Sequence, residues 1–199
     1  MRQEKERPYR RVVVINGYGC DLNSPLTPYL NRVRNFIVHN DVHNAIFCGG
    51  YTQRTSFPGR SEAQVMAEYI QDRLPDDYRL AVFLENQSYT TFDNCVEAVP
   101  IIRHIQHNLW DGQPPRPGEL TVFCEGQRLA KVQVMYWLLL PDYRPCADGL
   151  RVRFEIDSWE RANPLKEYTI KLFSELLMYF FPFWARRMRA KHIAASIKR

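Results

Sequence analysis

The sequence predicts an α/β protein built as a three-layer α/β/α sandwich. Five short apolar runs alternate along the chain with five longer segments whose apolar residues recur at helical spacing. Strands that alternate with helices of this length form right-handed crossovers, which make the sheet parallel and cover both of its faces. The first run, Val-Val-Val-Ile at 12–15, contains no polar residue, which is typical of a strand buried on both faces. We therefore expect a Rossmann-like fold with a five-stranded, mainly parallel sheet.

Turn and capping residues mark where the expected elements begin and end. Ser24 and Pro25 fit a helix N-cap followed by proline at the first helical position. Ser61 with Gln64 three positions later predicts a capping box. On such signals we expect strands at 12–15, 45–48, 80–84, 120–124 and 151–156, and helices at about 25–39, 61–74, 90–109, 132–140 and 163–181.

Length and composition indicate one globular domain, residues 1–199. The chain has a mass of 23.6 kDa, with 45% hydrophobic and 25% charged residues. Its net charge of +5 lies at the ends, because residues 1–11 carry +3, residues 185–199 carry +6 and the body carries −4. We expect a basic N-terminal arm at 1–11 and a basic C-terminal tail at 185–199. The body shows no basic face with base-reading residues, so nucleic acid is not expected as a partner.

The cysteines and the N-terminal residues predict a cytoplasmic protein. The five cysteines are an odd number without a Cys-x-x-Cys pair, which fits neither a disulfide framework nor a zinc knuckle. Reduced thiols in a cytosol are the simpler interpretation, and we expect them to be small apolar fillers rather than nucleophiles. Residues 1–11 are charged and lead into the first strand without a signal-peptide core.

Polar residues and glycines follow the expected strands, at the edge where open α/β sheets hold their ligands. Backbone N–H groups at helix N-termini there attract anions, so a phosphate-bearing or nucleoside-like ligand is expected. The candidates are Asn16, Gly17 and Gly19 after the first strand, Gly49, Gly50, Ser61 and Glu62 after the second, Glu85, Ser88, Thr91 and Asn94 after the third, and Glu125, Arg128 and Lys131 after the fourth.

The residue types suggest a role for each group of candidates. Glu62 and Glu85 are the candidate catalytic carboxylates, which would also make polar or ribose contacts, while Arg128 and Lys131 would neutralise charge. Backbone contacts are expected from Asn16 and the glycines. Helix capping alone would explain several of the hydroxyl and amide residues, Ser61 first among them. A Mg²⁺ site would need Asp21, Glu62, Glu85 and Glu125 to converge, and since no close spacing supports this, no metal is expected.

The motif around these candidates resembles a known family. Gly49-Gly50, then Ser61-Glu62-Ala63, then Glu85-x-x-Ser88-x-x-Thr91-x-x-Asn94 is similar to the signature of the bacterial YdcF/SanA/ElyC-like family of unassigned function, over about the first half of the chain. The resemblance implies a Rossmann-type sandwich, a link to envelope maintenance and a nucleoside ligand such as S-adenosylmethionine.

This chain departs from the family pattern at several positions. Cys48 stands where the family has serine, and Arg128 stands where it has histidine. Cys124 and Glu125 stand at the family's Thr-Ser turn, and Lys131 and Val132 stand at its Arg-Ala pair, so Lys131 keeps the cationic position. Because arginine does not give up its proton at working pH, no mechanism that uses that histidine as an acid or base is expected. A binding role for Arg128 is still expected.

Two functions stay open. The first is an enzyme that acts on or binds a phosphorylated or nucleoside-containing small molecule. The second is a non-catalytic sensor or scaffold that uses the aromatic segment 172–184 and the basic tail for a partner or a membrane surface. For that segment we favour a helix that covers the sheet over a homodimer face or a surface anchor, since the fold needs a covering helix after the fifth strand.

Overall fold

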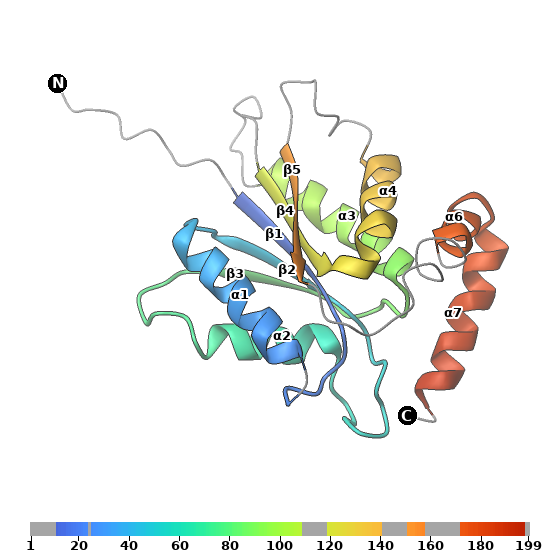
Figure 1. The fold of residues 1–199 in the computed structure, drawn as a ribbon, viewed down its shortest axis with the longest axis horizontal. Helices are drawn as coiled ribbons and strands as arrows, with labels where there is room; N and C mark the ends of the chain where they lie inside the picture. The colour runs from blue at the N-terminus through green and yellow to red at the C-terminus, as the bar shows by residue number, and fades with distance from the viewer. Residues whose placement is uncertain (1–10, 24, 109–118, 141–150, 158–171, 198–199) are drawn as a thin grey trace.

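The structure, a computed structural model, describes residues 11–23, 25–108, 119–140, 151–157 and 172–197. Its centre is a five-stranded sheet in which every strand pair is parallel, in the order β3-β2-β1-β4-β5 (Figure 1). The expected three-layer α/β/α fold is confirmed. The strands are β1 (Arg11–Asn16), β2 (Asn44–Cys48), β3 (Ala81–Glu85), β4 (Glu119–Glu125) and β5 (Arg151–Asp157).

Among the described residues, four helices form the two outer layers. α1 (Leu26–His39) and α2 (Glu62–Gln71) pack on one face of the sheet, and α3 (Thr91–Asn108) and α4 (Leu129–Leu139) pack on the other (Figure 1). The central strand β1 serves both layers, because Val13 and Ile15 lie in the α1–α2 core while Val12 and Val14 lie in the α3–α4 core. Alternation of side chains along the strand therefore explains why its apolar run is unbroken.

The strand order creates a topological switch between β1 and β4. The chain leaves β1 toward the α1 face, whereas it leaves β4 toward the α4 face through a 3-10 turn at Gly126–Arg128. β1 and β4 are neighbouring, hydrogen-bonded strands. Because the helices that follow them lie on opposite faces of the sheet, the two loops diverge at its carboxyl edge. Open α/β sheets bind ligands at such a point.

Local signals set the helix starts. Ser61 accepts a hydrogen bond from Gln64 N–H at 3.1 Å, and the Gln64 side chain accepts one from Ser61 N–H at 3.0 Å, which confirms the capping box. Pro25 occupies the N-cap position of α1 without a side-chain cap. Ser24, the expected cap of that helix, lies outside the described residues.

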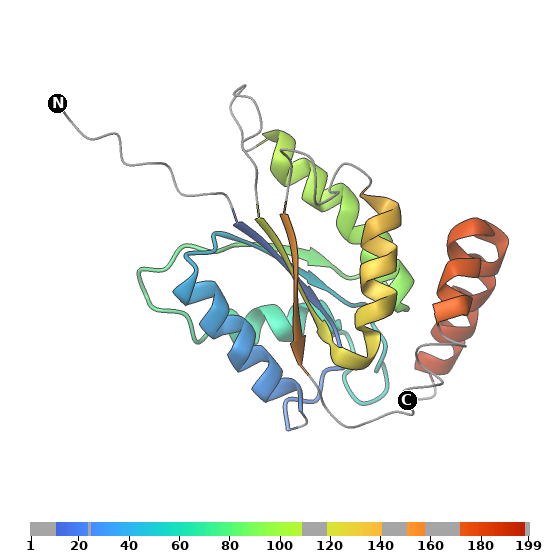
Figure 2. The ribbon, with the colours of Figure 1, turned by 45° about the horizontal axis from the view of Figure 1, so that its top comes forward.

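The C-terminal part of the chain corrects two expectations. α6 (Leu172–Phe180) packs against α3 and α4, which cover the sheet, so it forms an additional layer rather than the sheet's cover (Figure 2). α7 (Pro182–Ser196) packs against α6, and residues 185–196, expected as a tail, belong to this helix. The expected N-terminal arm and the start of the last helix, at 163–171, lie outside the described residues. Within the described part of the chain, none of the helices combines the length and apolar character that crossing a membrane requires.

Candidate functional site

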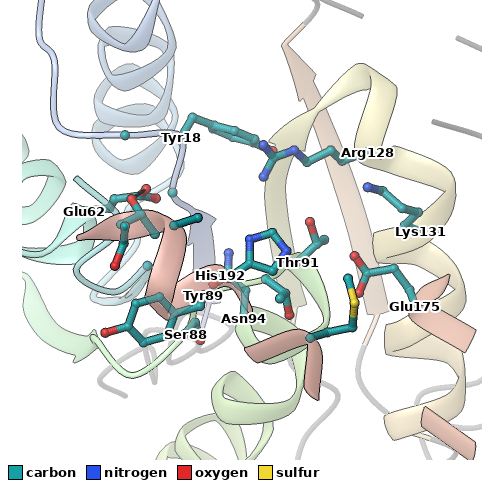
Figure 3. Close-up of a pocket in the computed structure, with 18 of the residues that line it drawn as sticks. Tyr18, Glu62, Ser88, Tyr89, Thr91, Asn94, Arg128, Lys131, Glu175 and His192 are labelled. Atoms are coloured by element: carbon teal, nitrogen blue, oxygen red, sulfur yellow. Dashed lines mark hydrogen bonds between the residues drawn. The ribbon is translucent and has the colours of Figure 1, made fainter. Parts of the chain in front are cut away.

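A cavity of about 420 Å³ lies at the carboxyl edge of the sheet, between the strand ends and the helices α6 and α7 (Figure 3). One wall comes from the loops after β1 to β4. The structure brings together on this wall the predicted residues Gly17, Gly19, Gly49, Glu62, Ser88, Thr91, Asn94, Arg128 and Lys131.

Two glycines, Gly17 and Gly49, leave the space that the carboxyl group of Glu62 occupies beside the ends of β1 and β2. A Cβ atom on Gly17 would lie 2.7 Å from the carbonyl oxygen of Cys48 and in contact with Glu62 Oε2. A Cβ atom on Gly49 would lie 2.8 Å from Glu62 Cβ and 2.9 Å from its Oε2. Gly17 and Gly49 are therefore required by close approach, since a side chain at either position would displace Glu62.

Glu62 is the first residue of α2 and is buried at the cavity wall. The hydroxyl of Thr52 and the backbone N–H of Gly19 donate hydrogen bonds to its carboxyl group. Burial raises the pKa of Glu62, while these hydrogen bonds and the charge of Arg128 oppose the rise. Glu62 is thus a buried carboxyl group with a raised pKa, held in place by Thr52 and Gly19. Because it lines the cavity, a bound ligand would contact it.

Arg128 is held over the cavity by its neighbours. Its guanidinium carbon lies 4.5 Å from the ring centroid of Tyr18, and its Nε lies 3.5 Å from Glu125 Oε2. The backbone N–H of Glu125 donates a hydrogen bond to the hydroxyl of Tyr18, so the three side chains form one unit. Glu125 is not among the residues that line the cavity, and its contacts make it the residue that positions Arg128.

Glu85 shapes the loop between β3 and α3. Its carboxylate accepts hydrogen bonds from Gln87 N–H at 2.7 Å and from the hydroxyl of Ser88. Gly50 N–H donates to the carbonyl oxygen of Ser88 at 2.8 Å, which ties this loop to β2. Burial raises the pKa of Glu85, but the structure does not place Glu85 or Gly50 on the cavity wall. Both residues contact Ser88, which does line the cavity.

Asn16 and Ser61 are also buried behind the wall rather than on it. Asn16 Nδ2 donates to the carbonyl oxygen of Phe123 at 2.9 Å, which links β1 to β4. Ser61 is used by the capping box of α2. The structure therefore gives these two residues structural contacts, as helix capping alone would predict for Ser61.

The N-terminus of α3 shows which polar residues do the capping. Thr90 Oγ1 accepts a hydrogen bond from Asp93 N–H at 3.0 Å, and Asp93 accepts one from Tyr89 N–H at 3.1 Å. Because this pair serves the helix end, Thr91 and Asn94 are not needed there, and both line the cavity.

The opposite wall was not predicted from the sequence. It consists of Ser174, Glu175 and Met178 from α6, and Met188, His192, Ala195 and Ser196 from α7. A lone carboxylate in the mainly apolar segment Leu172–Phe180 is the signal that could have indicated this wall. In Figure 3, Glu62 and Glu175 lie on opposite sides of the cavity, with Arg128 and His192 between them.

The cysteines and carboxylates bear on two further expectations. The four described cysteines, Cys20, Cys48, Cys95 and Cys124, are buried thiols without disulfides. Burial raises the pKa of Cys20 and of Cys124 to about 12, so neither is a thiolate near neutral pH, which agrees with their expected role as apolar fillers. Among the described residues, no three His, Cys, Asp or Glu side chains lie close enough together to hold a metal ion.

Comparison of this chain with protein-family models, with curated proteins and with solved structures finds no match. The resemblance to the YdcF/SanA/ElyC-like family stays a prediction from the motif alone.

Proposed function

We propose that the protein is an enzyme that binds and acts on a phosphorylated or nucleoside-containing small molecule in this cavity. The observation that carries the proposal is the guanidinium group of Arg128, fixed over the cavity at the switch point and facing the buried carboxyl of Glu62. A pocket with a few convergent polar groups and perturbed carboxyls is the arrangement expected of a small-molecule site.

The electrostatics of the sheet-side wall favour an anionic group. Arg128 carries a permanent charge and several hydrogen-bond donors, and Lys131 lines the same cavity. The helices α2 and α3 begin at Glu62 and Thr91, both on the cavity wall, so their N-terminal dipoles add positive potential. A phosphate group of the ligand would lie against this wall.

Glu62 would serve the uncharged part of the ligand. Its raised pKa and its hydrogen bonds suit a carboxyl that binds a ribose hydroxyl or exchanges a proton with it. The family resemblance supports a nucleoside such as S-adenosylmethionine, and with it a bacterial origin. The buried free thiols support a reducing cytoplasm.

A thermal-shift screen with nucleotides, sugar phosphates and S-adenosylmethionine tests the proposal. A ligand at 100 times its dissociation constant stabilises the folded protein by about 2.7 kcal/mol. We expect at least one compound to raise Tm in the wild type, and the rise to shrink in Arg128→Gln. The matched control is Arg103→Gln, which removes an exposed guanidinium on α3. The proposal fails if no compound raises Tm, or if Arg128→Gln responds like the control.

The aromatic surface at the junction of α6 and α7 favours a second candidate, a sensor or scaffold that docks on an anionic membrane surface. Phe180, Phe181 and Phe183 are 62%, 49% and 66% exposed. Arg186 and Arg187 follow one turn later and are also exposed. Aromatic rings beside exposed cations are typical of helices that lie on anionic lipid.

Vesicle co-sedimentation tests this second candidate. We expect the wild type to pellet with phosphatidylserine-containing vesicles more than with pure phosphatidylcholine. Changing Phe180, Phe181 and Phe183 to Ser together should abolish the difference, whereas Trp137→Ser, which removes an exposed ring on α4, should leave it. Equal pelleting with both vesicle types would refute lipid docking.

A further inference from the structure

We propose that Glu175 is a second ligand-binding residue of the cavity, which recognises a hydroxyl or amino group of the ligand through its Oε2 atom. This rests on the proposed function and makes the ligand class more specific. The ligand carries an anionic group for Arg128 and, on the opposite side, a hydrogen-bond donor for Glu175, as a nucleoside phosphate does.

The hydrogen bonding of Glu175 is incomplete in a way that points to a ligand. The side chain is only 7% exposed, and the backbone N–H of Phe92 donates to its carboxyl group. Its Oε2 atom is buried and has no hydrogen-bond partner among the described residues. Buried polar atoms in folded proteins are nearly always paired, because leaving one unpaired is unfavourable. Since Glu175 lines the cavity, its carboxyl group lies beside any ligand that enters.

The placement of Glu175 on α6 gives an independent reason. This helix exposes Phe173 and Phe180, each 62% accessible, while it buries its carboxylate. A helix that only covered α3 and α4 would bury its apolar residues and expose its carboxylate. A binding role in the cavity accounts for the buried carboxylate.

The charges around Glu175 allow it to accept or donate a hydrogen bond near neutral pH. Burial is the largest influence and raises the pKa of Glu175 to about 7, while Lys131 and Arg128 lower it and Asp93 raises it further. His192 from α7 lines the same cavity. Figure 3 shows the side chains of Lys131 and Glu175 extending into the same part of the cavity.

The remaining wall suits the carbon-rich part of such a ligand. Met178 from α6 and Met188 from α7 line the same wall of the cavity as Glu175. Methionine side chains are polarisable and adapt to flat rings. A nucleobase or sugar ring would therefore lie between the anionic group at Arg128 and the donor at Glu175.

Isothermal titration with two probes, adenosine 5′-monophosphate and inorganic phosphate, tests the role of Glu175. At pH 8, where Glu175 is ionised, we expect Glu175→Gln to weaken adenosine 5′-monophosphate binding about tenfold or more, because a hydrogen bond to a charged group is lost. Inorganic phosphate carries no nucleoside hydroxyl or amino group, and Glu175→Gln removes a negative charge that interacts with Arg128, so the affinity for phosphate should not fall. The control Glu68→Gln, on the exposed side of α2, should affect neither probe. Equal effects of Glu175→Gln on both probes, or none on the nucleotide, overturn the assignment.

If neither probe binds the wild type, a second measurement tests whether Glu175 is a buried acid. In a carbon-13 NMR titration of the ligand-free protein, the glutamate carboxyl resonance that Glu175→Gln removes should titrate near pH 7. A midpoint near 4.5, the ordinary glutamate value, would show a solvated carboxyl and overturn the assignment. A midpoint near 7 without binding of either probe would support the buried acid and refute the proposed nucleotide ligand instead.

Discussion

Gly17 and Gly49 lack side chains because the carboxyl group of Glu62 occupies the space beside them. In sequence these glycines look like ordinary turn residues, and Glu62 looks like a favourable charge at a helix start. Only the contact between them shows that the three residues form one unit. The unit keeps a carboxyl buried at the cavity wall, where burial raises its pKa.

Gly17→Ala tests this unit. The new methyl group would meet Glu62 Oε2 and lie 2.7 Å from the carbonyl oxygen of Cys48. We expect the free energy of unfolding, measured by urea denaturation, to fall by about 1–3 kcal/mol, the usual cost of overpacking. Gly59→Asn is the control, because a Cβ there meets nothing within 4 Å and asparagine tolerates the local φ of 74°. Equal stability of Gly17→Ala and the wild type would contradict the close approach.

At the scale of secondary structure, α7 closes the cavity through polar contacts as well as packing. Arg189 Nε lies 3.6 Å from Asp93 Oδ2, and its terminal nitrogen lies 3.4 Å from Glu97 Oε1 and from the carbonyl oxygen of Gln87. The other end of the helix is held by Thr55, whose hydroxyl donates to the carbonyl oxygen of Ile197 at 3.0 Å. The helix is therefore tied to α3 and to the loop after β2, on both sides of the site.

Arg189→Gln should loosen α7 without unfolding the sheet. Loss of charged hydrogen bonds worth about 1.5 kcal/mol would speed amide hydrogen exchange of residues 183–196 about tenfold. Exchange in β1 and β4 should not change. Arg187→Gln, an exposed change on the same helix, should leave exchange as in the wild type. If both variants exchange alike, Arg189 does not hold the helix.

At the scale of the whole molecule, the fold and one wall of the cavity follow from the sequence. Apolar runs and helical spacing predict the parallel sheet, and parallel strands bring their following loops to one edge, where Arg128 and Glu62 meet. The wall formed by α6 and α7 does not follow, because helices that pack on other helices have no fixed relation to the strand ends. For the same reason Glu175 was seen only as an interruption of an apolar segment.

Glu85 is a residue that the sequence predicts at the cavity and the structure does not place there. A carboxylate directly after a strand predicts a cavity residue, but Ser88 and Gln87 N–H satisfy it within its own loop. Sequence spacing cannot show whether a buried carboxylate turns toward a ligand or toward its own backbone. Glu62, at the start of α2, receives its hydrogen bonds from other loops and lines the cavity, whereas Glu85, at the end of β3, receives its hydrogen bonds from its own loop.

Buried acids also shape the pH dependence of global stability. The pKa of Glu175 is raised from 4.5 to about 7 in the folded protein, so between these values the folded state binds more protons than the unfolded state. Stability from this group is present below pH 4.5 and is lost as pH rises through 7. The total loss is of the order of 3 kcal/mol, from about 1.4 kcal/mol per pKa unit.

Urea denaturation of the wild type and Glu175→Gln between pH 4.5 and pH 8 measures this loss. Glutamine stays neutral, so the variant should gain stability relative to the wild type as pH rises. A residual slope shared by both proteins is expected, since the pKa values of Glu62 and Glu85 are raised as well. Parallel stability curves would mean that Glu175 titrates alike in the folded and unfolded states.

The central claim is that a phosphorylated ligand binds between the switch point and the α6–α7 pair. A crystal structure with adenosine 5′-monophosphate, or with the compound that raises Tm most, tests it directly. We predict that a phosphate oxygen lies within hydrogen-bond distance of the Arg128 guanidinium and a ligand hydroxyl or amino group within hydrogen-bond distance of Glu175 Oε2. A ligand bound elsewhere, or a cavity filled by protein side chains, would contradict the account.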